Sequence, residues 1–181
     1  MDQKAVNIHE ELIARCKAGE PSAYHQLYRL YSKSMYNVAY RIVWDEDDAS
    51  DVLQESFISA FNNLDHYRGD ATFGAWFKRI VINKALNMLK RKKMESLPED
   101  DRWDVPEEEG PDLEYDDLTV ERVKRAIEQL PEGYRSVLSL YLIEGYDHQE
   151  IGEILGVSES TSKSQLNRAK HKLREFLNPS L

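Results

Sequence analysis

A strongly acidic stretch divides this sequence into two parts. Residues 95–121 contain 13 Asp and Glu residues and a single Arg, whereas the segments on either side are nearly neutral. The stretch also contains three prolines and one glycine, and its apolar residues follow no helical period. Because like charges repel along such a chain, we expect an extended linker. The sequence therefore predicts two domains, residues 1–94 and 122–181, joined by this linker. On composition alone, this linker is interpreted as a solvated spacer without any binding partner.

The composition allows two small cores and excludes several classes of protein. Of the 181 residues, 41% are apolar, which suffices for globular domains. No apolar run approaches the roughly 20 residues that cross a bilayer, and no signal-peptide pattern is present, so we expect a cytoplasmic protein without membrane insertion of its own. Cys16 is the only cysteine and the five histidines are scattered. The sequence thus predicts no disulfide, no metal site and no cofactor.

The first domain has the pattern of a bundle of amphipathic helices. Apolar residues from Tyr24 to Ile42 recur at intervals of three and four, which predicts one long helix. The acidic sequence WDEDDASD follows it and predicts the capped start of a helix at about residues 48–64, because carboxylates stabilise a helix N-terminus. A nuclease metal site is the competing interpretation of these acids. Neighbouring acids of one turn cannot converge on one ion, so capping is favoured.

The helix predicted at residues 48–64 has two different faces. Its apolar face, which we expect in the core, comprises Leu53, Phe57, Ala60, Phe61 and Leu64. The opposite face combines hydrogen-bonding side chains with an Ile, which favours a protein-docking surface, although an ordinary solvated face is the alternative. The candidate docking residues are Asp51, Gln54, Glu55 and Ile58.

A basic helix is predicted over residues 75–93, where the surrounding segment 71–94 contains seven Lys and Arg residues and no acid. Its apolar face runs from Phe77 to Leu89. Cations and carboxamides on the other face have the spacing to follow a phosphate backbone and to hydrogen-bond base edges. The candidate residues on this outer face are Trp76, Arg79, Asn83, Asn87, Lys90 and Arg91.

The segment before this helix, HYRGDATF, places aromatic rings beside a cation. Tyr67, Arg68 and Phe73 lie close in sequence to Trp76. Aromatic rings next to cations suit unpaired bases, because every base has a π-face on which a ring can stack. The pattern predicts a single-strand binding site. The alternative is that the aromatic rings are simply core residues.

The second domain has the pattern of two helices followed by a helix-turn-helix. Ile151, Leu155 and Val157 occupy predicted core positions, Gly152 lies where two helices approach, and Gly156 lies in the turn. Ser158 is placed to cap the next helix.

That next helix, predicted at about residues 159–175, carries polar and basic side chains mainly in its first half. This is the part of a recognition helix that enters the major groove, so the pattern favours DNA binding, with a packing unit as the alternative. The candidate DNA-binding residues are Thr161, Lys163, Ser164, Gln165, Asn167, Arg168 and Lys172.

The order of these motifs resembles a known family. The sequences DVLQESFISAF, YRGDATFGAWFKRIVINKALNMLKRKK, the acidic linker, LPEGYRSVLSLYLIEGYDHQEIGEILGVS and TSKSQLNRAKHKLR are similar to those of extracytoplasmic-function (ECF) sigma factors of bacterial RNA polymerase. The similarity extends over nearly the whole chain.

The resemblance implies roles for the candidate residues. Asp51, Gln54 and Glu55 match a surface that docks on the clamp helices of the large subunit of core RNA polymerase. The HYRGDATF loop matches one that captures a flipped base of the minus-ten promoter element. The helix beneath that loop in the family is matched by Trp76, Arg79, Asn83 and Asn87. Lys163, together with Ser164, Asn167 and Arg168, matches the minus-thirty-five reading positions. An anti-sigma factor is a further partner implied by the family.

Two residues depart from the family pattern. Ser162 stands where the family usually has a β-branched apolar residue, and a Ser at this place can hydrogen-bond to the carbonyl four residues before it. Gln165 replaces a common Arg, which removes one cation from the reading edge.

We therefore predict an all-α protein with two small helical domains: a region 2-like domain at residues 1–94 and a region 4-like helix-turn-helix domain at residues 122–181. The predicted function is that of a transcription initiation factor that binds core polymerase and promoter DNA and catalyses no reaction. A stand-alone helix-turn-helix regulator is the alternative, but it would not explain a first domain with a docking face and a base-stacking edge.

Overall fold

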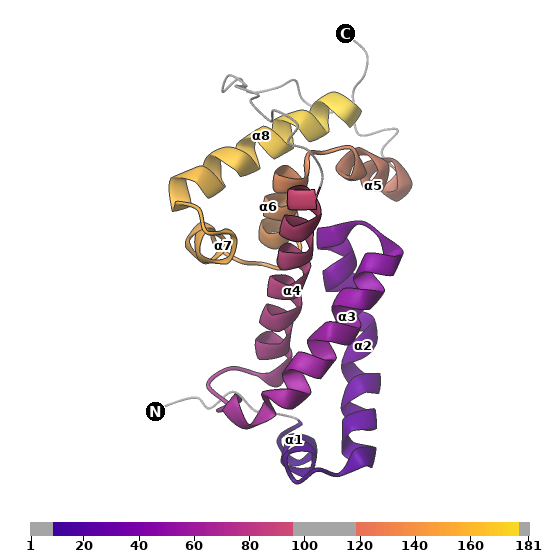
Figure 1. The fold of residues 1–181 in the computed structure, drawn as a ribbon. Coiled ribbons are helices and arrows are strands. Elements are labelled where there is room, and N and C mark those ends of the chain that lie inside the picture. Colours follow the sequence, from indigo (N-terminus) through magenta and orange to yellow (C-terminus); the bar gives the residue numbers. More distant parts are fainter. Residues whose placement is uncertain (1–8, 96–118, 178–181) are drawn as a thin grey trace. The chain divides into compact units, whose positions relative to one another are not determined.

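The computed structural model describes residues 9–95 and 119–177 (Figure 1). The described residues form α-helices and one 3-10 helix and contain no β-strand, which agrees with the predicted all-α fold class. The chain divides into two compact units, Met1–Leu97 and Pro98–Leu181, and this boundary lies inside the predicted linker. Most of that linker lies outside the described residues. None of the helices in the two described ranges is long and apolar enough to span a bilayer.

The first unit consists of three long helices and a short N-terminal helix. The long helices α2, α3 and α4 pack against one another, and α1 packs against α2 (Figure 1). The elements of this unit are α1 (Glu10–Lys17), α2 (Pro21–Val43), α3 (Glu46–Asn62), η1 (Leu64–His66) and α4 (Phe73–Glu95).

The acidic sequence before α3 caps that helix, as predicted. Asp45 is the N-cap residue, and its carboxylate accepts a hydrogen bond of 2.9 Å from the backbone N–H of Asp48. Further acids follow in the first turn, where they face the positive end of the helix dipole. Trp44 ends the preceding helix in a left-handed conformation with φ of 55°, so the chain turns sharply between α2 and α3.

The core of the first unit confirms the predicted faces of the helices. Every residue predicted for the inner face of α4, from Phe77 to Leu89, is buried. On the predicted apolar face of α3 and the turn after it, Phe61 is only half-buried, and the buried residues are Leu53, Phe57, Ala60 and Leu64. The ring centroids of Phe57 and Phe77 lie 4.6 Å apart, which joins α3 to α4 through an aromatic contact. This packing fixes which faces of α3 and α4 remain in contact with solvent.

The second unit places three shorter helices against one long helix. Helix α8 packs on α5, α6 and α7 (Figure 1). Helices extend slightly into the range predicted as linker: α4 includes Glu95, and Thr119 caps a helix that begins at Val120 by accepting a hydrogen bond of 3.2 Å from the N–H of Arg122. The helices of this unit are α5 (Val120–Glu128), α6 (Glu132–Leu142), α7 (His148–Leu155) and α8 (Glu159–Leu177).

The turn between α7 and α8 has the predicted helix-turn-helix features. Gly156 adopts φ of 71°, and the N–H of Val157 donates to the carbonyl of Gly152 at 2.9 Å. A Cβ on Gly152 would lie 2.8 Å from the Val157 carbonyl oxygen, so only glycine fits at this close approach. Ser158 caps α8 by accepting from the N–H of Thr161 at 3.1 Å.

Two of the predicted core positions in this turn are wrong. Ile151 is buried as expected, but Leu155 and Val157 are only half-buried. Ile154 is buried instead, because α7 turns the face that contains residues 151 and 154 toward α8.

Candidate nucleic-acid and protein interfaces

The outer face of α3 carries all four residues predicted for protein docking. Asp51, Gln54, Glu55 and Ile58 are exposed, and Ile58 keeps 57% of its surface accessible. They are held outward because the opposite side of the helix is packed in the core. An exposed Ile one turn beyond two carboxylates is a combination that can bind a partner presenting both cations and apolar side chains.

A second, oppositely charged surface lies on α4. Lys84 of this helix reaches the docking face, where its Nζ lies 3.7 Å from the Glu55 carboxylate. The two faces therefore adjoin on neighbouring helices. Of the outer residues of α4, Trp76 and Arg79 are half-buried, and the exposed ones are Asn83, Asn87, Lys90 and Arg91.

The aromatic residues beside α4 are divided between core and surface. Phe73 has no accessible surface and Tyr67 keeps only 6%. The structure therefore favours the core alternative for these two rings, because a buried ring offers no face to a base. Trp76 is half-buried and Arg68 is exposed, so these two residues retain groups that a nucleic acid can reach.

The buried rings support the exposed one. The centroid of the Trp76 ring lies 5.3 Å from that of Tyr67 and 5.5 Å from that of Phe73. The Tyr67 hydroxyl donates a hydrogen bond of 2.7 Å to the carbonyl of Ala71, within the loop that joins η1 to α4. Trp76 thus packs against the buried rings of Tyr67 and Phe73, which restricts the rotamers of its side chain.

The second unit presents its predicted DNA-binding residues along α8. The helix buries Ser162, Leu166 and Ala169 against the rest of the unit. The predicted reading residues lie off this buried side: Lys163 and Asn167 are exposed, and the half-buried ones are Thr161, Ser164, Gln165, Arg168 and Lys172.

Some of these polar groups already have partners within the helix. Lys163 pairs with Glu159 at 2.6 Å, and Lys172 pairs with Glu175 at 3.1 Å. The Ser164 hydroxyl donates to the carbonyl of Thr161 at 3.0 Å. Within the described part of the chain, no hydrogen bond or ion pair engages the side chains of Gln165, Asn167 and Arg168. These three side chains can bind a ligand without first breaking a hydrogen bond or an ion pair within the described residues.

The buried Ser162 has a partner that sequence analysis did not identify. Its hydroxyl lies 3.0 Å from Nδ1 of His148 on α7, so the hydroxyl is satisfied between helices, in place of the bond to its own helix that we had considered. The His148 ring also stacks on Tyr141 of α6, with centroids 4.6 Å apart. Since His148 has no motif of its own, no sequence signal pointed to it.

No group of three or more His, Cys, Asp or Glu side chains among the described residues is arranged to hold a metal ion.

Comparisons with known proteins agree with this arrangement. The family model for sigma-70 region 2 matches residues 27–95, and the model for sigma-70 region 4 matches residues 120–173. The chain is 31% identical to the RNA polymerase sigma-H factor of Pseudomonas aeruginosa, with 95% of each chain covered. It is 32% identical to the ECF RNA polymerase sigma factor SigM of Mycobacterium tuberculosis, with 92% of this chain and 83% of SigM covered. The chain belongs to the ECF sigma factors of the sigma-70 family.

This sigma factor also resembles longer relatives and solved structures. It is 34% identical to the ECF sigma factor SigE of Mycolicibacterium smegmatis over 89% of its own length, but spans only 63% of SigE. Its fold is similar to that of CnrH, solved in complex with the cytosolic domain of CnrY, with a TM-score of 0.57, 25% identity and 94% and 97% of the two chains covered. RpoE of Bartonella quintana has a similar fold, with a TM-score of 0.60, 22% identity and 87% and 98% coverage.

The two family matches include the candidate interfaces on α3, α4 and α8. The region 2 match includes α3 and α4 with both of their exposed faces, and the region 4 match includes the helix-turn-helix of α7 and α8. The family consists of non-enzymatic transcription initiation factors, which confirms the prediction that the chain is not an enzyme. Helix α1, at residues 10–17, lies outside both matches.

Proposed function

We propose that this sigma factor binds core RNA polymerase, directs it to specific promoters and helps to open the DNA there. The observation that carries the proposal is the pair of adjoining faces on the first unit, acidic and apolar on α3 and basic on α4. Two surfaces of opposite charge on one small unit suit simultaneous contact with a protein and with DNA. A regulator that acts only by occupying an operator needs no such docking face.

The contact with polymerase is assigned to the α3 face. Asp51, Gln54, Glu55 and Ile58 would dock on the clamp helices of the large subunit. This assignment is supported by the exposure of all four side chains, since each can reach a partner without any rearrangement of the core. An exposed apolar side chain next to hydrogen-bonding groups can be buried by a partner while those groups pair with it.

The contact with the minus-ten element is assigned to the outer face of α4 and the preceding loop. Arg68 and Trp76 would bind unpaired bases, and the helix would follow the backbone of the DNA strand. Tyr67 and Phe73 would act from the core by supporting Trp76, since both are buried. The residues assigned to the strand along α4 are Arg79, Asn83, Asn87, Lys90 and Arg91.

The contact with the minus-thirty-five element is assigned to the first half of α8. Gln165, Asn167 and Arg168 are the strongest candidates for reading bases, because their side chains have no partners within the described part of the chain. Lys163 and Lys172 would contact phosphates. Thr161 and Ser164 would contribute hydroxyls to the same surface.

An anti-sigma factor is a further proposed partner. The sigma factor RpoE of Bartonella quintana was solved in complex with the anti-sigma factor NepR, and its similar fold covers 87% of this chain. A protein that covered the α3 face would prevent polymerase binding by direct competition. Because polymerase and promoter are the proposed partners, we place the site of action in the cytoplasm.

Run-off transcription with purified core polymerase tests the function directly. The template is a promoter from the region upstream of this protein's own coding sequence, and the control reaction contains core polymerase alone. A discrete transcript that requires both proteins supports an initiation factor. Sequence-specific DNA binding without core polymerase, together with no polymerase-dependent transcript, would instead identify a stand-alone regulator.

A further inference from the structure

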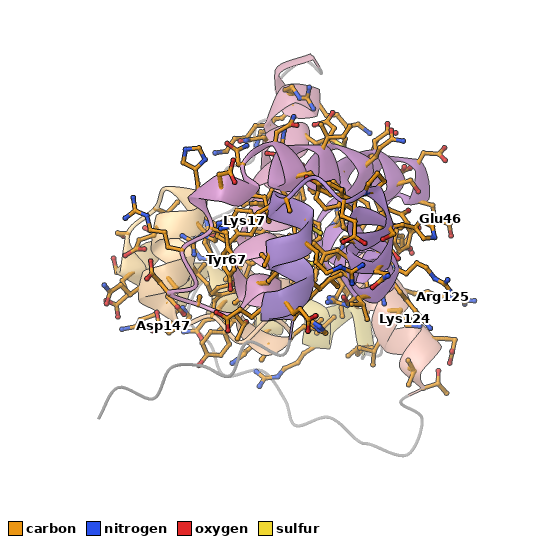
Figure 2. The ribbon with its side chains drawn as sticks, turned by 90° about the horizontal axis from the view of Figure 1, so that it is seen from below. Lys17, Glu46, Tyr67, Lys124, Arg125 and Asp147 are labelled. Atoms are coloured by element: carbon orange, nitrogen blue, oxygen red, sulfur yellow. The ribbon has the colours of Figure 1, made fainter. Side chains whose placement is uncertain are left out.

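Helix α1 is bonded to the loop that precedes the basic helix. Lys17, its last residue, donates a hydrogen bond of 2.9 Å from Nζ to the backbone carbonyl of Tyr67. The same ammonium lies 5.9 Å from the centroid of the Tyr67 ring, within the range of a cation–π contact. Figure 2 labels both residues, which lie next to each other. One side chain of α1 thus holds both the backbone and the ring of Tyr67.

Helix α1 is itself firmly attached to the bundle. Its Ile13 and Cys16 are buried against the rest of the unit. At its C-terminal end, Nε of Arg15 donates to the Glu20 carboxylate at 2.7 Å. Hydrogen bonds from Arg15 and Ser22 lower the pKa of Glu20 to about 2, so the carboxylate stays charged at the pH at which transcription is measured. Lys17 therefore projects from a fixed support.

The loop from Tyr67 to Thr72 is closed by contacts at both ends. The hydroxyl of Tyr67 donates to the carbonyl of Ala71 at 2.7 Å, and Gly69 supplies the positive φ of 80° that the turn between them requires. Thr72 accepts a hydrogen bond of 3.2 Å from the N–H of Ala75 and so starts α4. Residues 68–72 are exposed on this frame.

We propose that Lys17 is a positioning residue for promoter opening, which fixes the loop so that Arg68 and Trp76 meet an unpaired base without further ordering. Lys17 acts through Tyr67, whose carbonyl it holds and whose ring lies 5.3 Å from that of Trp76. Binding to a loop that is already ordered avoids the entropic cost of ordering it. This inference rests on the proposed function, and it adds α1, which lies outside the matched family regions, to the DNA-binding machinery.

A direct phosphate contact by Lys17 is the competing explanation, because the residue is exposed. The two explanations differ in their signatures. Loss of a phosphate contact lowers the salt slope of binding by about 0.7 to 0.9 and weakens all sequences alike. Loss of a positioning contact leaves the salt slope unchanged and reduces discrimination between bases at the position the loop reads.

The test compares Lys17→Met, Lys17→Arg and Lys33→Met in the full chain with core polymerase. Lys33 on α2 is a matched control: it is exposed and makes no hydrogen bond, ion pair or cation–π contact with the described residues. Open-complex formation is measured on duplex and pre-melted templates, with minus-ten variants and at several salt concentrations. Hydrogen exchange of the backbone amides is measured in the free protein.

We expect Lys17→Met to slow opening about tenfold on duplex DNA, a change that corresponds to about 1.4 kcal/mol. Base discrimination should fall, exchange should rise at residues 67–72 alone, and Lys17→Arg should restore most of the activity. Activity of Lys17→Met equal to that of Lys33→Met would overturn the inference, as would a reduced salt slope with unchanged base discrimination. Faster exchange throughout the first unit would also overturn it, by showing a general loss of stability. Failure of the parent chain to support any core-dependent transcript would instead refute the proposed function.

Discussion

Nδ1 of His148 lies 3.0 Å from the hydroxyl of Ser162, and this contact joins the first turn of α7 to the buried side of α8. Ser162 has no accessible surface, so its hydroxyl needs a partner within the protein. The His148 ring is fixed in turn by stacking on Tyr141. A polar contact between helices thus occupies the place where an apolar side chain was expected from the family pattern.

We predict that this pair contributes measurably to the stability of the second unit. Ser162→Ala removes the partner of Nδ1, and His148→Ala leaves a buried hydroxyl unsatisfied, so each should lower the free energy of unfolding by about 1–2 kcal/mol. A double-mutant cycle measured by urea denaturation should give a coupling energy of about 0.5–1.5 kcal/mol. Gln149→Ala, an exposed neighbour in the same turn, is the control. Additive effects of the two substitutions would show that the hydrogen bond does not stabilise the unit.

Charge reversal on the α3 face should remove binding to core polymerase. We expect the double variant Asp51→Lys and Glu55→Lys to lower affinity by at least about tenfold, since two attractive contacts become repulsive. Both side chains are exposed, so the helical circular-dichroism signal and the thermal midpoint should change little. Binding is measured by co-purification and by fluorescence titration with core polymerase.

The matched control for this experiment is Glu121→Lys with Glu128→Lys on α5. It makes the same change in net charge at two exposed acids of the second unit. If both double variants lose binding equally, net charge alone is responsible. If neither loses binding, α3 is not the docking surface.

The recognition helix should show different behaviour at Lys163 and Arg168. Lys163 is paired with Glu159, as expected for a phosphate-binding cation that is partly neutralised in the free protein. Lys163→Ala should therefore lower the salt slope of DNA binding by about 1 across all sequences, and Glu159→Gln should raise affinity. Arg168→Ala should cost about 1–3 kcal/mol at one base position and relax the preference there.

Footprinting and titrations over a range of salt concentrations, with promoter variants, distinguish these signatures. Asn167→Ala provides a third, uncharged reading position for comparison. Unchanged binding in both Lys163→Ala and Arg168→Ala would remove α8 from the proposed interface.

The spacing of apolar residues predicted the buried face of α4, and the acidic sequence before α3 predicted its cap. Phe77 and Val81 are buried and Asn83 is exposed because a helix repeats every 3.6 residues, and this geometry is local. Asp45 caps α3 for an equally local reason. The buried face of a helix and its N-cap can therefore be predicted from neighbouring residues in the sequence.

Contacts between distant segments were beyond the reach of the sequence pattern. The bond from Lys17 to Tyr67 spans 50 residues, and the one from His148 to Ser162 depends on how α7 crosses α8. The role of Tyr67 could not be predicted either, because an aromatic ring beside a cation in the sequence is compatible with a binding site or with a core position. Only the tertiary structure shows that this ring is buried while Trp76 remains partly accessible.

Because Phe73 is buried and Trp76 is partly accessible, we predict that alanine substitutions of the two residues impair different properties of the protein. Phe73 has no accessible surface, so Phe73→Ala should lower the free energy of unfolding by about 3–5 kcal/mol and impair every activity of the first unit. Trp76→Ala should cost less stability, because the ring is only half-buried, and should chiefly slow promoter opening.

Stacking of a base on an aromatic ring contributes about 1–3 kcal/mol, and it is available only once the base is unpaired. A template with a pre-melted bubble should therefore restore transcription by Trp76→Ala but not by Phe73→Ala, with urea denaturation of both variants measured alongside. Equal losses on duplex and pre-melted templates for Trp76→Ala would assign Trp76 to the core together with Phe73, and would leave Arg68 as the group that meets the unpaired base.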